Sequence, residues 1–271
     1  DSVEKISCLM MAHMATPKVL LEECLRLEDK GIDAVSIYDS AGYFDPDNIK
    51  ELFSFLRENL SINIGFHGHN NIGLAVANSY EAVCCGASIV DASVCSFGAG
   101  AGNTQLEVLA TYFGRKNIST GLDLKYLYDL AEFASTTYAK IKPYSDPLSI
   151  SSSVNGLFSG FKKHILKAAS INNINCYDLV ESLGKKNIIA GQEDQIYIDA
   201  SLLANTLTPS ESCASFIEKS LPVTWPTGQE KLIPEKLLAK RQAYTKLLEK
   251  SDDELKNNHL PAYLALQDLS E

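Results

Sequence analysis

The sequence predicts a parallel α/β fold, in which four βα units form part of a (β/α)8 TIM barrel and a helical domain follows them. The first observation is that apolar runs of strand length alternate with helical patterns through about the first 115 residues. The second is that His13, Asp39, His67 and Asp91 recur at intervals of 26, 28 and 24 residues, each at or near the end of a run. Because parallel strands end at one edge of a sheet, these polar groups should gather on one face. A flavodoxin-like sheet has the same rhythm, but there polar groups would end only the strands at one switch point.

The individual units follow from apolar periodicity and from the residues that start and stop helices. Apolar runs without alternation, such as 6–11, predict strands that are buried on both faces. Pro17 and Pro46 each stand at the start of a helical stripe, where proline is well tolerated. The predicted elements are strand 6–11, helix 19–30, strand 34–38, helix 46–59, strand 62–66, helix 74–85, strand 88–94 and helix 106–113.

The pattern becomes helical from about Leu122 onward, so the chain resembles half a barrel followed by a helical appendix. Ser151–Ser153 is predicted to be a loop that caps the next helix. The predicted segments are helices 126–137, 154–170 and 177–183, a helix or strand 195–203, an irregular connection 205–232 that contains Trp225, and amphipathic tail helices 235–250 and 252–269. The predicted domains are therefore 1–120, the second half of a barrel; 121–204, a helical domain; and 205–271, a linker and tail of unknown role.

Composition narrows the class of protein. The chain has 271 residues and a formal net charge of −10, without a basic run that could bind nucleic acid. No apolar run approaches the roughly 18 residues of a membrane span, and the first residues do not read as a signal peptide. The seven cysteines form no C-x-x-C pair and lie mostly in apolar runs, which indicates buried thiols in a cytoplasmic protein. Cys95 follows a strand, but no histidine base stands beside it.

The stretch His67-Gly68-His69 ends the third predicted strand and is the strongest candidate for chemistry. Side chains at i and i+2 on a strand point to the same face, so two imidazoles about 6–7 Å apart can share one divalent ion. A single H-x-H motif is common in proteins, so this spacing alone does not identify a metal site.

Several motifs together resemble one family. They lie in residues 9–14, 38–42, 67–71, 76–79, 91–93, 98–103, 106–108 and 191–194. With these motifs the chain is similar to the 4-hydroxy-2-oxovalerate aldolases, metal-dependent class II pyruvate aldolases related to 3-hydroxy-3-methylglutaryl-CoA lyase and isopropylmalate synthase. The H-x-H-N and V-A-N-S motifs mark the whole group, whereas G-A-G-A-G-N is more specific to the aldolases, and the resemblance covers about residues 8–203.

The resemblance implies roles for single residues. His67 and His69 match two histidine ligands of a divalent metal, usually Mn²⁺, and Ser40 matches a residue that contacts pyruvate. Asp39, which precedes Ser40, either holds the loop after the second predicted strand or a metal ligand in place, or is a helix-cap or turn residue. His13 either contacts the substrate or is a polar residue at the end of a strand.

The resemblance also implies what this sequence does not supply. The family's first-strand segment, with an arginine, a metal-binding aspartate and a base histidine, has no counterpart here, and we expect it upstream of Asp1. A tyrosine of the family's helical domain aligns with Phe158, which can neither donate a hydrogen bond nor relay a proton. The catalytic residues of this chain are therefore unknown. The missing half would come from a longer coding region, which we rank first, from a second polypeptide, or from a dimer whose site would still lack the arginine.

Three functions follow as hypotheses. The first is cleavage of a 4-hydroxy-2-oxo acid to pyruvate and an aldehyde, with this chain alone incomplete or inactive. The second is a non-catalytic scaffold whose helical domain docks an acylating aldehyde dehydrogenase. The third is a CoA-ester lyase or synthase of the same barrel group. In each case the sequence predicts no nucleic-acid partner and no membrane partner.

Overall fold

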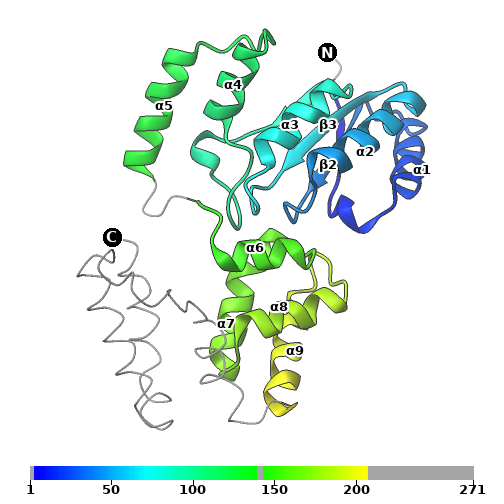
Figure 1. Cartoon of the computed structure of the whole chain (residues 1–271). Coiled ribbons are helices and arrows are strands. Elements are labelled where there is room, and N and C mark those ends of the chain that lie inside the picture. The colour runs from blue at the N-terminus through cyan, green and yellow to red at the C-terminus, as the bar shows by residue number, and fades with distance from the viewer. Residues whose placement is uncertain (1–2, 139–142, 207–271) are drawn as a thin grey trace, which may run out of the picture. The chain divides into compact units, whose positions relative to one another are not determined.

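The computed structural model describes residues 3–138 and 143–206 (Figure 1). The chain separates into two compact units, residues 1–204 and 205–271. The predicted connection with Trp225 and both predicted tail helices lie outside the described residues, apart from residues 205–206, which end the last described helix.

Four parallel strands form one sheet in the order β1-β2-β3-β4, which confirms the predicted fold class. The register places Tyr38, His67 and Asp91 side by side on β2, β3 and β4. The strands are β1 (Ile6–Leu9), β2 (Ala34–Asp39), β3 (Asn63–Gly68) and β4 (Ile89–Asp91).

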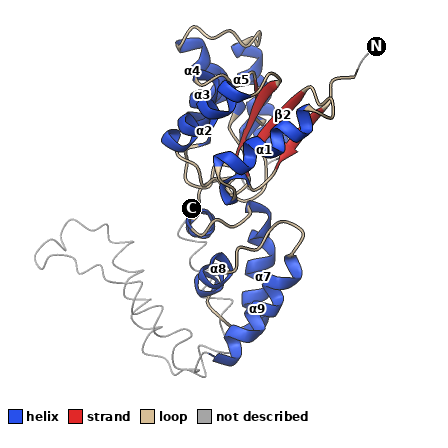
Figure 2. Cartoon of the chain, turned by 90° about the vertical axis from the view of Figure 1, so that its right-hand side faces the viewer, coloured by secondary structure: helices blue, strands red, loops and turns tan. Residues whose placement is uncertain are grey.

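A helix follows each strand, as the alternating pattern predicts. Thr16 and Asp45 accept hydrogen bonds from the first turns of α1 and α2, and a proline follows each cap. Helix α1 packs on β2 and α3 packs on β3, while α2 contacts both of these helices (Figure 2). These helices are α1 (Pro17–Glu28), α2 (Pro46–Asn59), α3 (Ala75–Cys84) and α4 (Leu106–Arg115).

The two faces of the sheet differ in chemistry. Val35, Ile37, Ile64 and Phe66 belong to the buried core between the sheet and its helices. Because side chains alternate along a strand, Tyr38 and His67 lie on the opposite face. Because of this alternation, the apolar side chains point toward the helices, and Tyr38 and His67 point to the other face of the sheet.

Strand β1 corrects two expectations. It covers only Ile6–Leu9, and its residues alternate between exposed and half-buried rather than being buried on both faces. Ile6 is 46% exposed. Within the described sheet β1 pairs with β2 alone, so it has a neighbour on one side. The predicted strand could not continue to residue 11, because Met11 has a φ of 55°, which is incompatible with an extended backbone.

Helix α5 (Leu124–Thr137) contacts α4 and the short helix η2 (Val94–Ser96), so it packs with the sheet-bearing part of the chain. The helices that follow have a hydrophobic core of their own, which includes Leu157, Phe161 and Leu179 and shares no residue with the core under the sheet. We refer to residues 143–206 as the helical module. The predicted boundary between the first two domains stays a prediction.

The prediction of one long helix over 154–170 is wrong, because the helical module has two α-helices and a short 3-10 helix in this region. Asp146 and Pro147 start α6 (Pro147–Val154) earlier, because the aspartate accepts two N–H groups of the first turn. Ser151–Ser153 therefore lie in a helix, and Gly156, with φ 65°, follows its end. The remaining elements are η1 (Ala12–Met14), η3 (Ser159–Phe161), α7 (Lys162–Asn172), α8 (Cys176–Lys185) and α9 (Glu193–Thr206), the last being a helix where the sequence left helix or strand open.

The cysteines are less buried than their apolar surroundings in the sequence predict. Among the described cysteines only Cys24 is buried, and its burial raises its pKa to about 12. Cys8 and Cys84 are exposed. Across residues 3–138 and 143–206, no helix combines the length and the apolar composition that crossing a membrane would need.

Candidate metal centre

The two histidines of the H-x-H motif lie next to each other, as their spacing predicts. His67 is in β3 and His69 directly follows its end, and their ring centroids are 5.3 Å apart. Tyr38, on the neighbouring strand, stacks on the ring of His67 with a centroid distance of 4.2 Å. The imidazole pair therefore lies at the carboxyl end of the sheet, where parallel α/β folds place their sites.

Asp91 orients His67. Its Oδ2 lies 3.3 Å from Nδ1 of His67, across the register pair of β3 and β4. The hydrogen bond with His67 holds the pKa of Asp91 below its ordinary value, although burial acts in the opposite direction. Since Nδ1 of His67 faces this carboxylate, Nε2 is the ring nitrogen left for a ligand.

His69 is buried and neutral. Its side chain is mostly enclosed, and Nδ1 is buried without a hydrogen-bond partner. Burial, followed by the neighbouring His67, lowers the pKa of His69 to about 4, although the carbonyl of Ala99 raises it. A neutral imidazole is the form that binds a metal ion, so burial prepares this side chain as a ligand.

These residues fit part of a divalent cation site. Two adjacent imidazoles, one with an orphaned buried nitrogen, are suitable donors for an ion of intermediate hardness. In the described parts of the chain, however, no group of three or more His, Cys, Asp and Glu side chains comes close enough to hold a metal. Two neutral donors alone bind such an ion weakly, so further ligands would be needed.

Asn103, which from the sequence either positions backbone near the metal or shapes a turn, is a neighbour of His69. It forms an antiparallel β-bridge with His69, and its Oδ1 is buried without a partner. The glycine-rich turn before it has little freedom, because a Cβ on Gly102 would lie 1.9 Å from the carbonyl oxygen of Ser96. The signal in the sequence was the asparagine at the end of G-A-G-A-G-N.

Asp39 shapes the loop after β2. Its Oδ1 accepts the N–H of Tyr43 at 2.8 Å, and its Oδ2 accepts the N–H of Phe44 at 3.1 Å. Burial raises the pKa of Asp39 to about 7, while these backbone N–H groups act to lower it. The side chain is fully buried, so it holds the loop and does not face the imidazole pair as an open carboxylate.

Ser40 is likewise buried, and its hydroxyl is already engaged. Its Oγ accepts the N–H of Met11 at 3.0 Å. This contact joins the loop after β2 to Met11, which follows β1 and has a left-handed backbone conformation. In this bond the hydroxyl of Ser40 acts as an acceptor, so its hydrogen is still available for donation.

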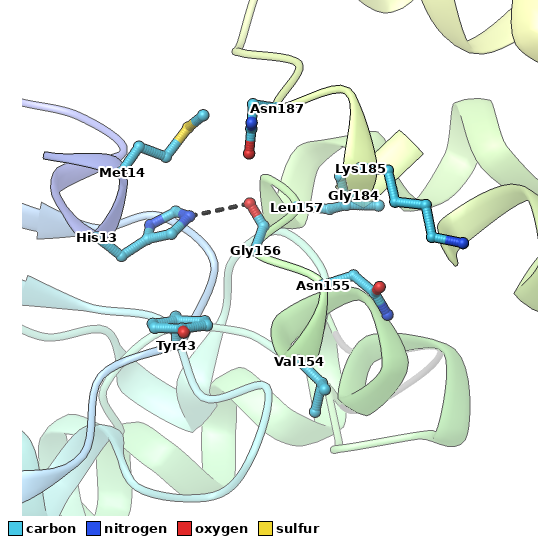
Figure 3. A pocket seen from close by; sticks show the side chains of 10 residues that line it. All are labelled: His13, Met14, Tyr43, Val154, Asn155, Gly156, Leu157, Gly184, Lys185 and Asn187. Carbon is cyan, nitrogen blue, oxygen red and sulfur yellow. Dashed lines mark hydrogen bonds between the residues drawn. The ribbon is translucent and has the colours of Figure 1, made fainter. Parts of the chain in front are cut away.

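His13 lies apart from the imidazole pair. Its Nε2 is 2.9 Å from the carbonyl oxygen of Gly156, and its ring stacks on Tyr43 at 5.2 Å (Figure 3). Both residues line a pocket of about 580 Å³ between η1 and the ends of α6 and α8, and neither His67 nor His69 lines it. The structure therefore does not bring His13 together with the candidate ligands.

Phe158 packs within the helical module. Its ring meets that of Phe161 edge to face at a centroid distance of 5.4 Å, and it borders the buried core of the module. The position that the resemblance aligns with a family tyrosine thus holds an apolar ring that packs on another apolar ring.

Two family models match this chain. Residues 3–134 match the family described as HMGL-like, and residues 143–205 match the DmpG-like communication domain. A 4-hydroxy-2-oxovalerate aldolase of Pectobacterium atrosepticum is 47% identical over 72% of this chain and 57% of its own length. One from Spirochaeta aurantia is 45% identical over 69% of this chain and 55% of its own length. The chain thus spans little more than half the length of these relatives.

A solved structure supports the fold. The carboxyl transferase domain of Rhizobium etli pyruvate carboxylase, with pyruvate and biocytin, matches with a TM-score of 0.63 over 76% of this chain and 38% of its own. Its sequence identity of 18% supports the architecture alone.

The fold and these matches define the chain as part of an HMGL-like α/β barrel, followed by a helical DmpG-like communication domain. Within that class it is a relative of the 4-hydroxy-2-oxovalerate aldolases, so the resemblance stated from the motifs is confirmed.

Proposed function

We propose that this chain carries part of the active site of a metal-dependent aldolase, which cleaves a 4-hydroxy-2-oxo acid to pyruvate and an aldehyde. The observation that carries the proposal is the pair of imidazoles at the carboxyl end of the sheet, one of them oriented by Asp91. The names of the aligned relatives support the substrate class.

His67 and His69 would hold the metal, which we propose to be Mn²⁺. When bound, the metal would polarise the 2-oxo group and stabilise the negative charge of the enolate. Asp91 keeps the ring of His67 in one orientation, and burial keeps His69 neutral. Asp39 and Ser40 set the path of the loop after β2 through their bonds to backbone N–H groups. The proposed contact of Ser40 with pyruvate rests on the resemblance to the aldolases.

We propose that this chain alone is inactive or nearly so. The described residues offer two imidazoles and no group of three metal-binding side chains. Among the described residues, neither remaining histidine is placed as a base for the pair, because His13 contacts the carbonyl oxygen of Gly156 and His164 contacts Tyr197. The carboxylate ligand and the base would come from another segment of polypeptide, a second copy of the chain, or the substrate and water.

A second candidate function is a non-catalytic scaffold. The apolar packing of Phe158 favours it, because a phenylalanine in this position cannot relay a proton. The match of residues 143–205 to a communication domain supports docking of an acylating aldehyde dehydrogenase in either case. Free thiols such as Cys8 and Cys84 are consistent with a protein of the cytoplasm.

The decisive experiment measures Mn²⁺ binding and catalysis on the full chain. We expect Mn²⁺ to bind weakly, and His67→Ala or His69→Ala to abolish this binding. His164→Ala is the matched control, since His164 contacts Tyr197 within the helical module. Binding that is unchanged in both His67 and His69 variants would refute the metal site.

Catalysis separates the alternatives. We expect little or no pyruvate from 4-hydroxy-2-oxopentanoate with Mn²⁺ and the chain alone, and clear release once a polypeptide that supplies the first half of an aldolase barrel is added. Metal binding without release in the reconstituted mixture would favour the scaffold. Turnover of acyl-CoA substrates in its place would favour the CoA-ester reaction.

A further inference from the structure

Ser159, in η3 of the helical module, is bonded to two loops at the carboxyl end of the sheet. Its N–H donates to the carbonyl oxygen of Ser40 at 2.9 Å, and its hydroxyl donates to Oδ1 of Asn71 at 3.1 Å. The residue is almost completely buried. One residue therefore joins the loop after β2 to the loop after β3.

Asn71 completes this connection from the other side. It follows His69 by two residues, is 1% exposed, and its Nδ2 donates to the carbonyl oxygen of Ser149 at 3.2 Å. Both ends of the amide are thus held by the helical module. Leaving such a buried group unpaired is unfavourable, so these bonds restrict the path of the loop.

The three loops at this edge also touch one another. A Cβ on Gly42 would lie 2.8 Å from the carbonyl oxygen of His69, and one on Gly100 would lie 3.0 Å from Cβ of Ser159. The loops after β2, β3 and β4 therefore meet at Ser159 and Asn71. Little space is left for the backbone of His69 to shift without moving this group.

Hydrogen bonds join the helical module to these loops. The module and the sheet have separate hydrophobic cores, and the connection includes hydrogen bonds from Ser145 Oγ to the carbonyl oxygen of Asn70 and from Ser153 Oγ to that of Gly42. Hydrogen bonds depend on distance and angle, whereas apolar burial is not directional. Such an interface fixes the orientation of the loops more than it adds bulk stability.

We propose that Ser159 and Asn71 are positioning residues, through which the helical module holds His69 in the place required for metal binding. The inference rests on the proposed function, because it assigns a purpose to the contacts around a proposed ligand. Neither residue would touch the metal or the substrate. Their effect is carried by the backbone between His69 and Asn71.

The test compares two buried serines of the module in the full chain. Ser159→Ala removes the bond to Asn71, whereas Ser153→Ala removes an equally buried bond that reaches only the loop after β2. We expect Ser159→Ala to raise the dissociation constant for Mn²⁺ by about tenfold, and Ser153→Ala to leave it within about twofold. Equal effects of the two variants, or no effect of either, would overturn the proposal.

Two further measurements keep the test decisive. Ser145→Ala removes the bond to Asn70 at a half-buried position, so this variant should fold even if Ser159→Ala does not. We expect its affinity for Mn²⁺ to be two- to threefold weaker, on the order of a single lost hydrogen bond. Amide hydrogen exchange over residues 67–74 needs no metal. It should be faster in Ser159→Ala, or in Ser145→Ala should the first variant not fold, than in Ser153→Ala.

The two proposals can fail separately. Wild-type protein that binds no Mn²⁺ would refute the proposed metal site, while the exchange comparison would still decide whether these residues position the loop. Protein that binds Mn²⁺ with the same affinity and exchanges at the same rate in every variant would refute the positioning role alone.

Discussion

The carboxylate of Asp91 lies 3.3 Å from Nδ1 of His67, and the two residues are register partners on adjacent parallel strands. The two residues are 24 positions apart in the sequence, and they are in contact because β4 pairs with β3 in the sheet. The pair determines which nitrogen of His67 remains available, and the first prediction follows from it.

Asp91→Asn should weaken Mn²⁺ binding about 10- to 100-fold, the usual effect of removing a partner that orients a ligand. The amide has nearly the same shape as the carboxylate but lacks its charge. Titration of the chain, followed by the electron paramagnetic resonance signal of free Mn²⁺, measures the change. Asp47→Asn, on the exposed start of α2, is the control and should bind like the wild type. Equal affinities of the two variants would show that Asp91 does not orient His67.

Gly102→Ala should destabilise the protein much more than Gly121→Ala. Both glycines have positive φ, 89° and 71°, which costs an alanine roughly 1–2 kcal/mol. At Gly102 the new Cβ would also lie 1.9 Å from the carbonyl oxygen of Ser96, whereas nothing lies within 4 Å at Gly121. We expect a loss in unfolding free energy of about 1 kcal/mol at Gly121 and at least about 3 kcal/mol at Gly102, measured by urea denaturation. Similar losses would contradict the close approach of backbone in this turn.

Core substitutions in the two hydrophobic clusters should be additive. Ile64 and Ile165 are fully buried in separate clusters, and Ile→Val costs about 0.5–1.5 kcal/mol at each. We expect the double variant Ile64→Val/Ile165→Val to lose the sum to within about 0.5 kcal/mol in urea unfolding. Ile37→Val/Ile64→Val, within one cluster, is the comparison and should deviate more. A coupling energy above 1 kcal/mol between the clusters would mean that they form one core.

The unfolding free energy should depend on pH through His13. Burial lowers the pKa of His13, although the carbonyl of Gly156 raises it. The unfolded chain then takes up a proton below about pH 6.5, while the folded chain resists it. The stability contributed by His13 is therefore present above pH 6.5 and is lost as the pH falls toward the lowered pKa.

The measurement is urea unfolding of the wild type and of His13→Gln at pH 7.5 and pH 5.5. We expect the wild type to lose more stability than the variant across this interval. His69 titrates in the same direction in both proteins, so the difference between them reports on His13. A variant that loses as much stability as the wild type would show that His13 is freely protonated in the folded protein.

The sequence by itself determined the fold class and the candidate ligands. Alternation of apolar runs and helical stripes is a local property, because each strand or helix must bury one face, so the four βα units could be placed from periodicity. The H-x-H motif is equally local, since two residues on a strand point to one side. Asp146 and Pro147 are typical of a helix start, but Ser151–Ser153 also fit a capping loop, and that interpretation places the start of α6 too late.

The tertiary structure alone decided how these groups are connected. Register placed Asp91 against His67, and burial lowered the pKa of His69. The helical module supplies the carbonyl oxygen of Gly156 that His13 contacts, and it brings Ser159 into contact with Asn71 over a separation of 88 positions. Hydrogen-bond partners and desolvation depend on which distant segments meet, and a local pattern in the sequence carries no record of that.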